Sequence, residues 1–289
     1  MSPDLFAAHT TTSRDGTDIS YRAIGSGPGL VIVPGATALA EEFDGIAAAL
    51  AASFSVATMD RRGHGRSGRQ GPSYSLEREL EDIDAVRAAV GAKFLVGHSF
   101  GGFLVLESLR TNSNYTAAAV YEPGVFVDEP VETLEMDWAD RSAKEFNESK
   151  LLDAFISFVR GVNPETTGKA PRTMLKVILP LAMGRAELKR KSLVIPETIR
   201  EHREAARVGN QPSRYARIET PVLFMAGKDI ATTAAGRAAR RLSDLLPHAT
   251  LTTFPKLDHF GMERAPVTVA EVVIAALEST AAGNRKQAG

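Results

Sequence analysis

Hydrophobic residues follow two alternating patterns over most of the chain. Short runs predict strands at 30–33, 54–59, 93–97, 117–121, 221–226 and 249–254, and the fully apolar run at 30–33 suits a strand buried on both faces. Segments with apolar residues at helical spacing predict amphipathic helices, at about 41–52, 75–90, 103–109, 233–246 and 265–281. Strands that alternate with helices are typical of an α/β fold with a mostly parallel central sheet flanked by helices.

Two stretches depart from this alternation. Residues 9–13 and 19–24 flank a turn at 14–16 and predict an antiparallel hairpin at a sheet edge. From about 125 to 217 the patterns are mainly helical, including 151–159, 174–183 and 197–208, with prolines between them. We therefore expect a core formed by 1–124 and 218–289, with a helical insertion at 125–217.

Composition narrows the possible partners and compartments. The 289 residues are 44% hydrophobic, and 34 basic residues balance 35 acidic ones, so nothing favours a nucleic acid or a membrane surface as partner. The absence of cysteine excludes disulfides, thiolate catalysis and cysteine-bound metal. The N-terminus lacks a basic region followed by an apolar core, and no apolar run could span a bilayer, so a cytoplasmic protein is expected. The oligomeric state is left open.

The segment 97–101 carries the strongest chemical signal. It reads G-x-S-x-G, follows a predicted strand and precedes a predicted helix, with Ser99 at its centre. Glycines at 97 and 101 leave room for a turn tight enough to expose the Ser99 hydroxyl. The alternative is a glycine-rich turn with an incidental serine. The predicted strand and helix around the turn favour a nucleophile.

Through residues 97–102 the sequence resembles the α/β-hydrolase family. The resemblance covers about 10–123 and 218–281, and it implies that the helical insertion forms a cap over an active site. It also implies a serine, an acid and a histidine in that chain order. In relatives that hydrolyse epoxides or haloalkanes the nucleophile is an aspartate, so Ser99 argues against both activities.

His259 is the candidate general base. It lies just after the last predicted strand, in a loop that can bring an imidazole over the nucleophile, and the family histidine occupies such a loop. A surface-loop histidine is the alternative. The remaining histidines precede strands, lie in the insertion, or belong to the nucleophile turn and a glycine-rich loop.

Two acids compete to orient His259. Asp229 follows the 222–226 strand in a Gly-x-Asp turn, where the family acid often lies, and is preferred, although it could instead cap the next helix. Glu122 ends the preceding strand, where some relatives place their acid, and could alternatively line the pocket. Asp258 would point away from His259 in an extended segment and ranks low.

An oxyanion requires two amide donors. The Phe100 amide is one candidate, and the loop after Val33 should supply the other. The resemblance assigns that role to Ala36, with Thr37 as a possibility. The family usually has a histidine where this chain has Pro34, which leaves the bracing of the loop in question.

Residues 60–67 resemble the family's Asp-x-x-Gly-x-Gly-x-Ser loop. Their glycine spacing does not match a phosphate-binding loop, so a structural role near the site is expected for Asp60 and the arginines. No dinucleotide fingerprint or His-Glu-x-x-His motif occurs, and we infer no cofactor and no metal.

These features predict a serine hydrolase that cleaves an ester or lactone of a small hydrophobic substrate through an acyl-enzyme on Ser99. Carbon–carbon bond hydrolysis, a lyase or cyclase reaction, and a low-turnover binding protein remain as alternatives. An apolar pocket could draw on the large apolar residues of the insertion, although most of these are expected to pack its own helices. They are Phe126, Trp138, Phe146, Phe155, Phe158, Leu175, Ile178, Leu179, Leu181 and Met183.

Overall fold

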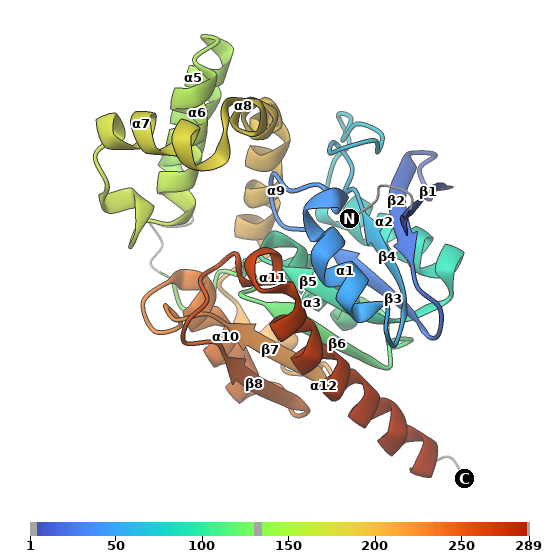
Figure 1. Cartoon of the computed structure of the whole chain (residues 1–289). Helices are drawn as coiled ribbons and strands as arrows, with labels where there is room; N and C mark the ends of the chain where they lie inside the picture. Colours follow the sequence, from blue (N-terminus) through green and yellow to red (C-terminus); the bar gives the residue numbers. More distant parts are fainter. Residues whose placement is uncertain (1–4, 130–134, 288–289) are drawn as a thin grey trace.

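The computed structural model describes residues 5–129 and 135–287. An eight-stranded sheet in the order β1-β2-β4-β3-β5-β6-β7-β8 forms its centre (Figure 1). The pairs β1–β2 and β2–β4 are antiparallel, and all the other pairs are parallel. The strands are β1 (Ala7–Thr12), β2 (Asp18–Ile24), β3 (Gly29–Val33), β4 (Ser55–Met59), β5 (Ala92–His98), β6 (Ala117–Tyr121), β7 (Val222–Ala226) and β8 (Ala249–Thr253). The predicted fold class is confirmed.

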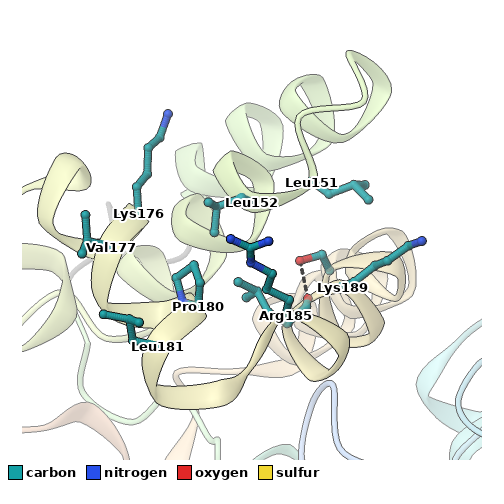
Figure 2. Close-up of a pocket in the computed structure, with 10 residues that line it drawn as sticks. Leu151, Leu152, Lys176, Val177, Pro180, Leu181, Arg185 and Lys189 are labelled. Carbon is teal, nitrogen blue, oxygen red and sulfur yellow. Dashed lines mark hydrogen bonds between the residues drawn. The ribbon is translucent and has the colours of Figure 1, made fainter.

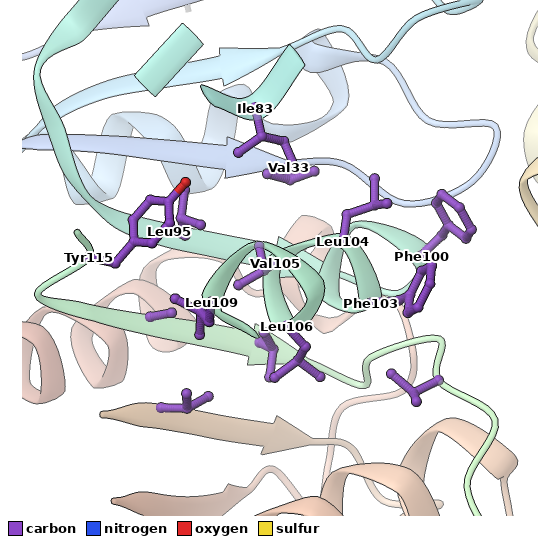
Figure 3. Close-up of a cluster of buried hydrophobic side chains, with 14 of the residues drawn as sticks. Val33, Ile83, Leu95, Phe100, Phe103, Leu104, Val105, Leu106, Leu109 and Tyr115 are labelled. Atoms are coloured by element: carbon purple, nitrogen blue, oxygen red, sulfur yellow. The ribbon is translucent and has the colours of Figure 1, made fainter. Parts of the chain in front are cut away.

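Helices cover both faces of the sheet. One face packs against α2 (Leu76–Val90), α3 (Phe100–Thr111) and α10 (Ala234–Leu245), as Figure 3 shows for part of this core. The other face packs against α1 (Asp44–Leu50) and α12 (Pro266–Gln287). In β3 the residues alternate between the two cores, with Val31 and Val33 in the first and Leu30 and Ile32 in the second. This explains why the strand is apolar throughout.

In the part of the chain that the structure describes, five α-helices lie between β6 and β7, and they are called the insertion helices. They are α5 (Asp137–Asn147), α6 (Leu151–Val162), α7 (Arg172–Met183), α8 (Arg185–Leu193) and α9 (Ile195–Val208). They enclose a third apolar cluster that includes Phe155, Phe158 and Ile199. Figure 1 shows α5 to α8 standing away from the sheet, with α9 between them and the strands.

Short helical turns connect several of these elements. They are η2 (Ala40–Phe43), η3 (Thr167–Lys169), η4 (Pro212–Tyr215) and α11 (Gly261–Arg264). The turn η2 divides the helix predicted at 41–52 into two parts. Across the described ranges 5–129 and 135–287, no helix is long and apolar enough to cross a membrane.

Candidate active site

Ser99 lies in a sharp turn between β5 and α3. Its backbone adopts φ 52° and ψ −122°, an unfavourable conformation for a residue with a side chain. A Cβ on Gly97 would lie 2.6 Å from the carbonyl oxygen of Gly101, so the turn requires glycine there. The Ser99 amide donates to the Tyr121 carbonyl at 3.0 Å, and the Ser99 carbonyl accepts from the Gly124 amide at 2.8 Å. The surrounding backbone therefore holds the strained serine in place.

His259 lies in the loop between β8 and α11, and its imidazole pairs with a buried carboxylate. Nδ1 of His259 is 2.7 Å from Oε2 of Glu122. The other carboxylate oxygen of Glu122 accepts a hydrogen bond from the Gly227 amide at 2.8 Å. Burial raises the pKa of Glu122, but the hydrogen bond and charge of His259 outweigh burial and leave that pKa below its usual value. Glu122 is thus placed to accept from a histidine that is protonated on Nδ1.

The structure corrects the predicted preference between the two acids. Asp229 follows β7 as expected, yet within the described part of the chain its carboxylate makes no hydrogen bond or ion pair. Its backbone carbonyl accepts from the amides of Thr232 and Thr233. The Gly227 amide in the same turn instead supports Glu122. His259 is therefore paired with the acid at the end of β6, and not with the one after β7.

Two side chains that were not predicted as site residues hold the histidine loop. The His98 ring contacts the carbonyl of His259, with Nε2 at 2.7 Å, and the Tyr121 hydroxyl donates to the carbonyl of Asp258 at 2.8 Å. Burial lowers the pKa of His98 to about 3, so its ring is neutral and donates from Nε2. Both residues occupy the last positions of their strands, where a side chain can reach a neighbouring loop. Their place at the end of a predicted strand was the sequence feature that could have identified them as site residues.

The loop after β3 approaches the nucleophile closely. A Cβ on Gly35 would lie 3.1 Å from Cβ of Ser99, and Thr37 has a positive φ of 61°. Within residues 5–129 and 135–287, the amides of Ala36 and Phe100 have no hydrogen-bond acceptor. Both amides are therefore free to donate to a ligand.

The loop is braced despite Pro34. Arg61 donates from Nε to the Pro34 carbonyl at 3.1 Å and from Nη2 to the Gly35 carbonyl at 3.2 Å. In the same 60–67 segment, the Asp60 carboxylate accepts from the amides of Ala40 and Arg66 at 2.9 and 3.2 Å. The segment ties loops together, as its sequence indicated.

A separate groove of about 550 Å³ lies among α6, α7 and α8 (Figure 2). Leu152, Val177 and Leu181 line it together with Lys176 and Arg185, and none of Ser99, Glu122 and His259 does. Of the apolar insertion residues noted from the sequence, Phe155, Phe158 and Leu175 are buried. Phe126, Trp138, Phe146, Leu179 and Met183 pack against buried clusters, whereas Ile178 and Leu181 are exposed. Most of these side chains therefore pack the protein's own helices.

Among the residues the structure describes, no group of three or more histidine, aspartate and glutamate side chains is arranged to hold a metal ion.

Comparisons with known proteins agree with this architecture. The model of the alpha/beta hydrolase family matches residues 30–272. A 2-(acetamidomethylene)succinate hydrolase from Mesorhizobium japonicum is 24% identical over 92% of this chain and 95% of its own length. A non-heme haloperoxidase from Rhodococcus erythropolis is 34% identical, but the match covers only 32% of this chain and 34% of that protein.

One solved structure shows the similarity in three dimensions. The esterase RhEst1 from Rhodococcus sp. ECU1013 superimposes with a TM-score of 0.65 over 94% of this chain and 99% of that protein, at 21% identity. At this level of identity the likeness concerns the fold.

Proposed function

Because the chain belongs to the alpha/beta hydrolase family, we propose that it is a serine hydrolase that cleaves a carboxylic ester or lactone of a small hydrophobic substrate. Two observations together carry the proposal: the 2.7 Å contact between His259 and the buried Glu122, and a serine held in a strained, glycine-flanked turn. Strain of this kind persists where the surrounding structure enforces it, and it gathers at functional sites.

The proposed reaction begins at Ser99. His259 takes the proton from the Ser99 hydroxyl as the serine oxygen attacks the carbonyl carbon of the substrate. The leaving alcohol departs with that proton, and an acyl-enzyme forms on Ser99. A water molecule deprotonated by His259 then releases the acid product. Glu122 holds the His259 ring with Nδ1 protonated and stabilises the imidazolium that forms in each half of the reaction.

The amides of Ala36 and Phe100 are proposed to stabilise the oxyanion. Both lack an acceptor in the described residues, and Gly35 brings the first of them close to Ser99. Donors that are fixed before the reaction stabilise developing charge without reorganising. Phe260, next to His259 in the chain, is half exposed and offers an apolar surface beside the proposed base. This surface supports the proposal that the substrate carries a hydrophobic acyl or alkyl group. In this proposal the insertion helices form the cap over the site.

Labelling with a fluorophosphonate probe, followed by peptide mapping, tests the proposal. We expect the wild-type protein to be labelled at Ser99 and to hydrolyse p-nitrophenyl esters or lactones, and S99A to lose both properties. S108A is the matched control, because Ser108 lies in α3, the helix that follows Ser99, and its buried hydroxyl has no hydrogen-bond partner among the residues that the structure describes. A folded S99A variant that kept its esterase activity would exclude Ser99 as nucleophile.

A further inference from the structure

Arg61 makes an unusual set of contacts for a residue outside the proposed triad. Its side chain is 1% exposed. It donates to two consecutive carbonyls of the loop after β3, those of Pro34 and Gly35. The guanidinium carbon also lies 4.8 Å from the centre of the Phe100 ring. One cation therefore contacts both segments that carry the proposed oxyanion donors.

The bond to Gly35 bears directly on the Ala36 amide. The Gly35 carbonyl and the Ala36 N–H belong to the same peptide unit, which is planar and trans, so the two groups point in opposite directions. Fixing the carbonyl oxygen on Arg61, at 3.2 Å from Nη2, therefore fixes the direction in which the Ala36 N–H points. A cation on the carbonyl oxygen also polarises the peptide and makes its N–H a better donor.

The far side of the guanidinium reaches an insertion helix. Nη2 of Arg61 donates to Oε2 of Glu201 at 3.0 Å, and Nη1 lies 2.9 Å from Oε1 of the same residue. Glu201 is buried on α9. The ring of the next residue, His202, lies tilted against the Phe100 ring, at a centroid distance of 5.7 Å. Helix α9 thus contacts the residues around the proposed oxyanion site through two adjacent side chains.

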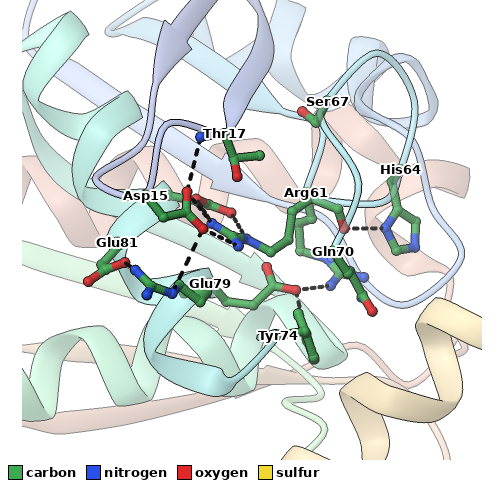
Figure 4. A network of polar contacts seen from close by, with 12 residues as sticks. Asp15, Thr17, Arg61, His64, Ser67, Gln70, Tyr74, Glu79 and Glu81 are labelled. Carbon is green, nitrogen blue, oxygen red and sulfur yellow. Dashed lines mark hydrogen bonds and ion pairs between the residues drawn. The ribbon is translucent and has the colours of Figure 1, made fainter. Parts of the chain in front are cut away.

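A second buried acid completes the environment of Arg61. Oε1 of Glu79 accepts from Nη1 of Arg61 at 3.1 Å and from the Tyr74 hydroxyl at 3.0 Å, and Figure 4 shows Glu79 beside both residues. Burial raises the pKa of Glu79 to about 8, whereas the charge of Arg61 overcomes burial and lowers the pKa of Glu201. Near neutral pH one ionised glutamate therefore balances one arginine, which makes a buried cation tolerable here.

From these contacts we infer that Arg61 is a positioning residue that orients the Ala36 amide toward the oxyanion and ties the loop after β3 to helix α9. The inference rests on the proposed hydrolase function. It assigns to this side chain the bracing that Pro34 cannot provide. The guanidinium is suited to this role, because its planar fork can bind two carbonyls and two carboxylates at once, whereas a lysine ammonium cannot.

The neighbouring Arg62 offers a matched control. It is also 1% exposed and also pairs with two acids, Asp82 and Asp15. Its guanidinium makes no contact with the loop after β3 or with α9 among the residues the structure describes. A general cost of disturbing a buried arginine should therefore appear equally in R61K and R62K.

The test compares kcat, KM and inhibition by a trifluoromethyl ketone in the wild type, R61K and R62K, with folding checked by circular dichroism and thermal melting. Loss of an oxyanion donor lowers kcat by about 10²- to 10³-fold, so a misdirected donor in R61K should lower kcat by roughly 10- to 100-fold. KM should change little. The ketone forms an adduct with the serine that carries the oxyanion, so its inhibition constant should rise in parallel with the loss of kcat/KM. In R62K these constants should stay near the wild-type values.

Equal kcat and equal ketone inhibition in R61K and R62K would overturn the inference while leaving the hydrolase function intact. Retained activity in S99A would instead refute the function itself. If R61K does not fold, E201Q is used instead, because it removes the carboxylate charge that pairs with Nη1 and Nη2 of Arg61. We expect a smaller loss of kcat and weaker ketone binding there, and unchanged constants in E201Q would equally overturn the inference.

Discussion

Replacing Glu122 by glutamine tests the proposed acid at a single atom. In the structure Oε1 of Glu122 accepts from the Gly227 amide and Oε2 contacts Nδ1 of His259. A glutamine has one oxygen, and the Gly227 amide requires an acceptor. The NH₂ group of the glutamine must therefore face Nδ1. His259 can accommodate that donor only if Nδ1 is unprotonated, which places the ring proton on Nε2, the atom that should receive the proton of Ser99.

The expected magnitude follows from this change of tautomer. In a serine protease triad, an acid-to-amide change with intact geometry lowers kcat by about 10⁴-fold. Glu122 is 2% exposed, so little solvent is available to replace the lost carboxylate. We expect E122Q to lower kcat by roughly 10³- to 10⁴-fold, with KM nearly unchanged because Glu122 lies behind the histidine and not against the substrate.

The assay is steady-state hydrolysis of a p-nitrophenyl ester by E122Q and by D229N, measured on protein whose fold is verified by circular dichroism. D229N is the matched control, because the Asp229 carboxylate has no partner in the part of the chain that the structure describes. It should keep kcat within about threefold of the wild type. A large loss in D229N combined with an active E122Q would refute the geometric argument and restore Asp229 as the acid.

Four further substitutions test the scaffold. In G101A the new Cβ would overlap the carbonyl oxygen of Val33, so we expect both stability and fluorophosphonate labelling to be lost. Between about pH 4.5 and 8 the folded state keeps a proton on Glu79 that the unfolded chain releases, so the contribution of Glu79 to the free energy of unfolding falls as pH rises, by up to about 1.4 kcal/mol per unit. In urea titrations the wild type should therefore lose stability relative to E79Q across this range. In the insertion, F155A should cost about 3–5 kcal/mol by thermal unfolding, whereas L181A, at an 80% exposed position, should cost under about 0.5 kcal/mol.

Local patterns were sufficient to predict the sheet, because each strand carries its own signal. A wholly apolar β3 has to bury both faces, and the structure divides its residues between two cores. The turn signal at 14–16 and the segments on either side of it likewise predicted the hairpin of β1 and β2, which the pairing of Thr12 with Asp18 confirms. The strained turn at Ser99 was predictable for the same reason, since its glycines lie next to it in the sequence.

The choice between Asp229 and Glu122 could not be made locally. Both acids follow parallel strands, and the distance from each to His259 depends on how three loops pack. The deciding feature is the Gly227 amide, which lies in the Asp229 turn but donates to Glu122 across 105 positions of sequence. The insertion was harder still, since α8 was not among the predicted helices. Charged residues occupy much of that helix and obscure its apolar face.

The loop after β3 shows how the insertion could affect catalysis without touching the substrate. Arg61 holds the carbonyls before Ala36, while Lys191 on α8 donates to the carbonyl of Thr37 at 3.3 Å. Lys191 also pairs with Glu42 at 2.6 Å, and Arg61 pairs with a glutamate of α9. Arg61, which contacts α9, and Lys191, which belongs to α8, therefore hold the loop on the two sides of the Ala36 amide, the proposed donor. Because a peptide plane turns only when its carbonyl is released, a shift of α8 or α9 should change the direction of the Ala36 N–H before it changes the contact between His259 and Glu122.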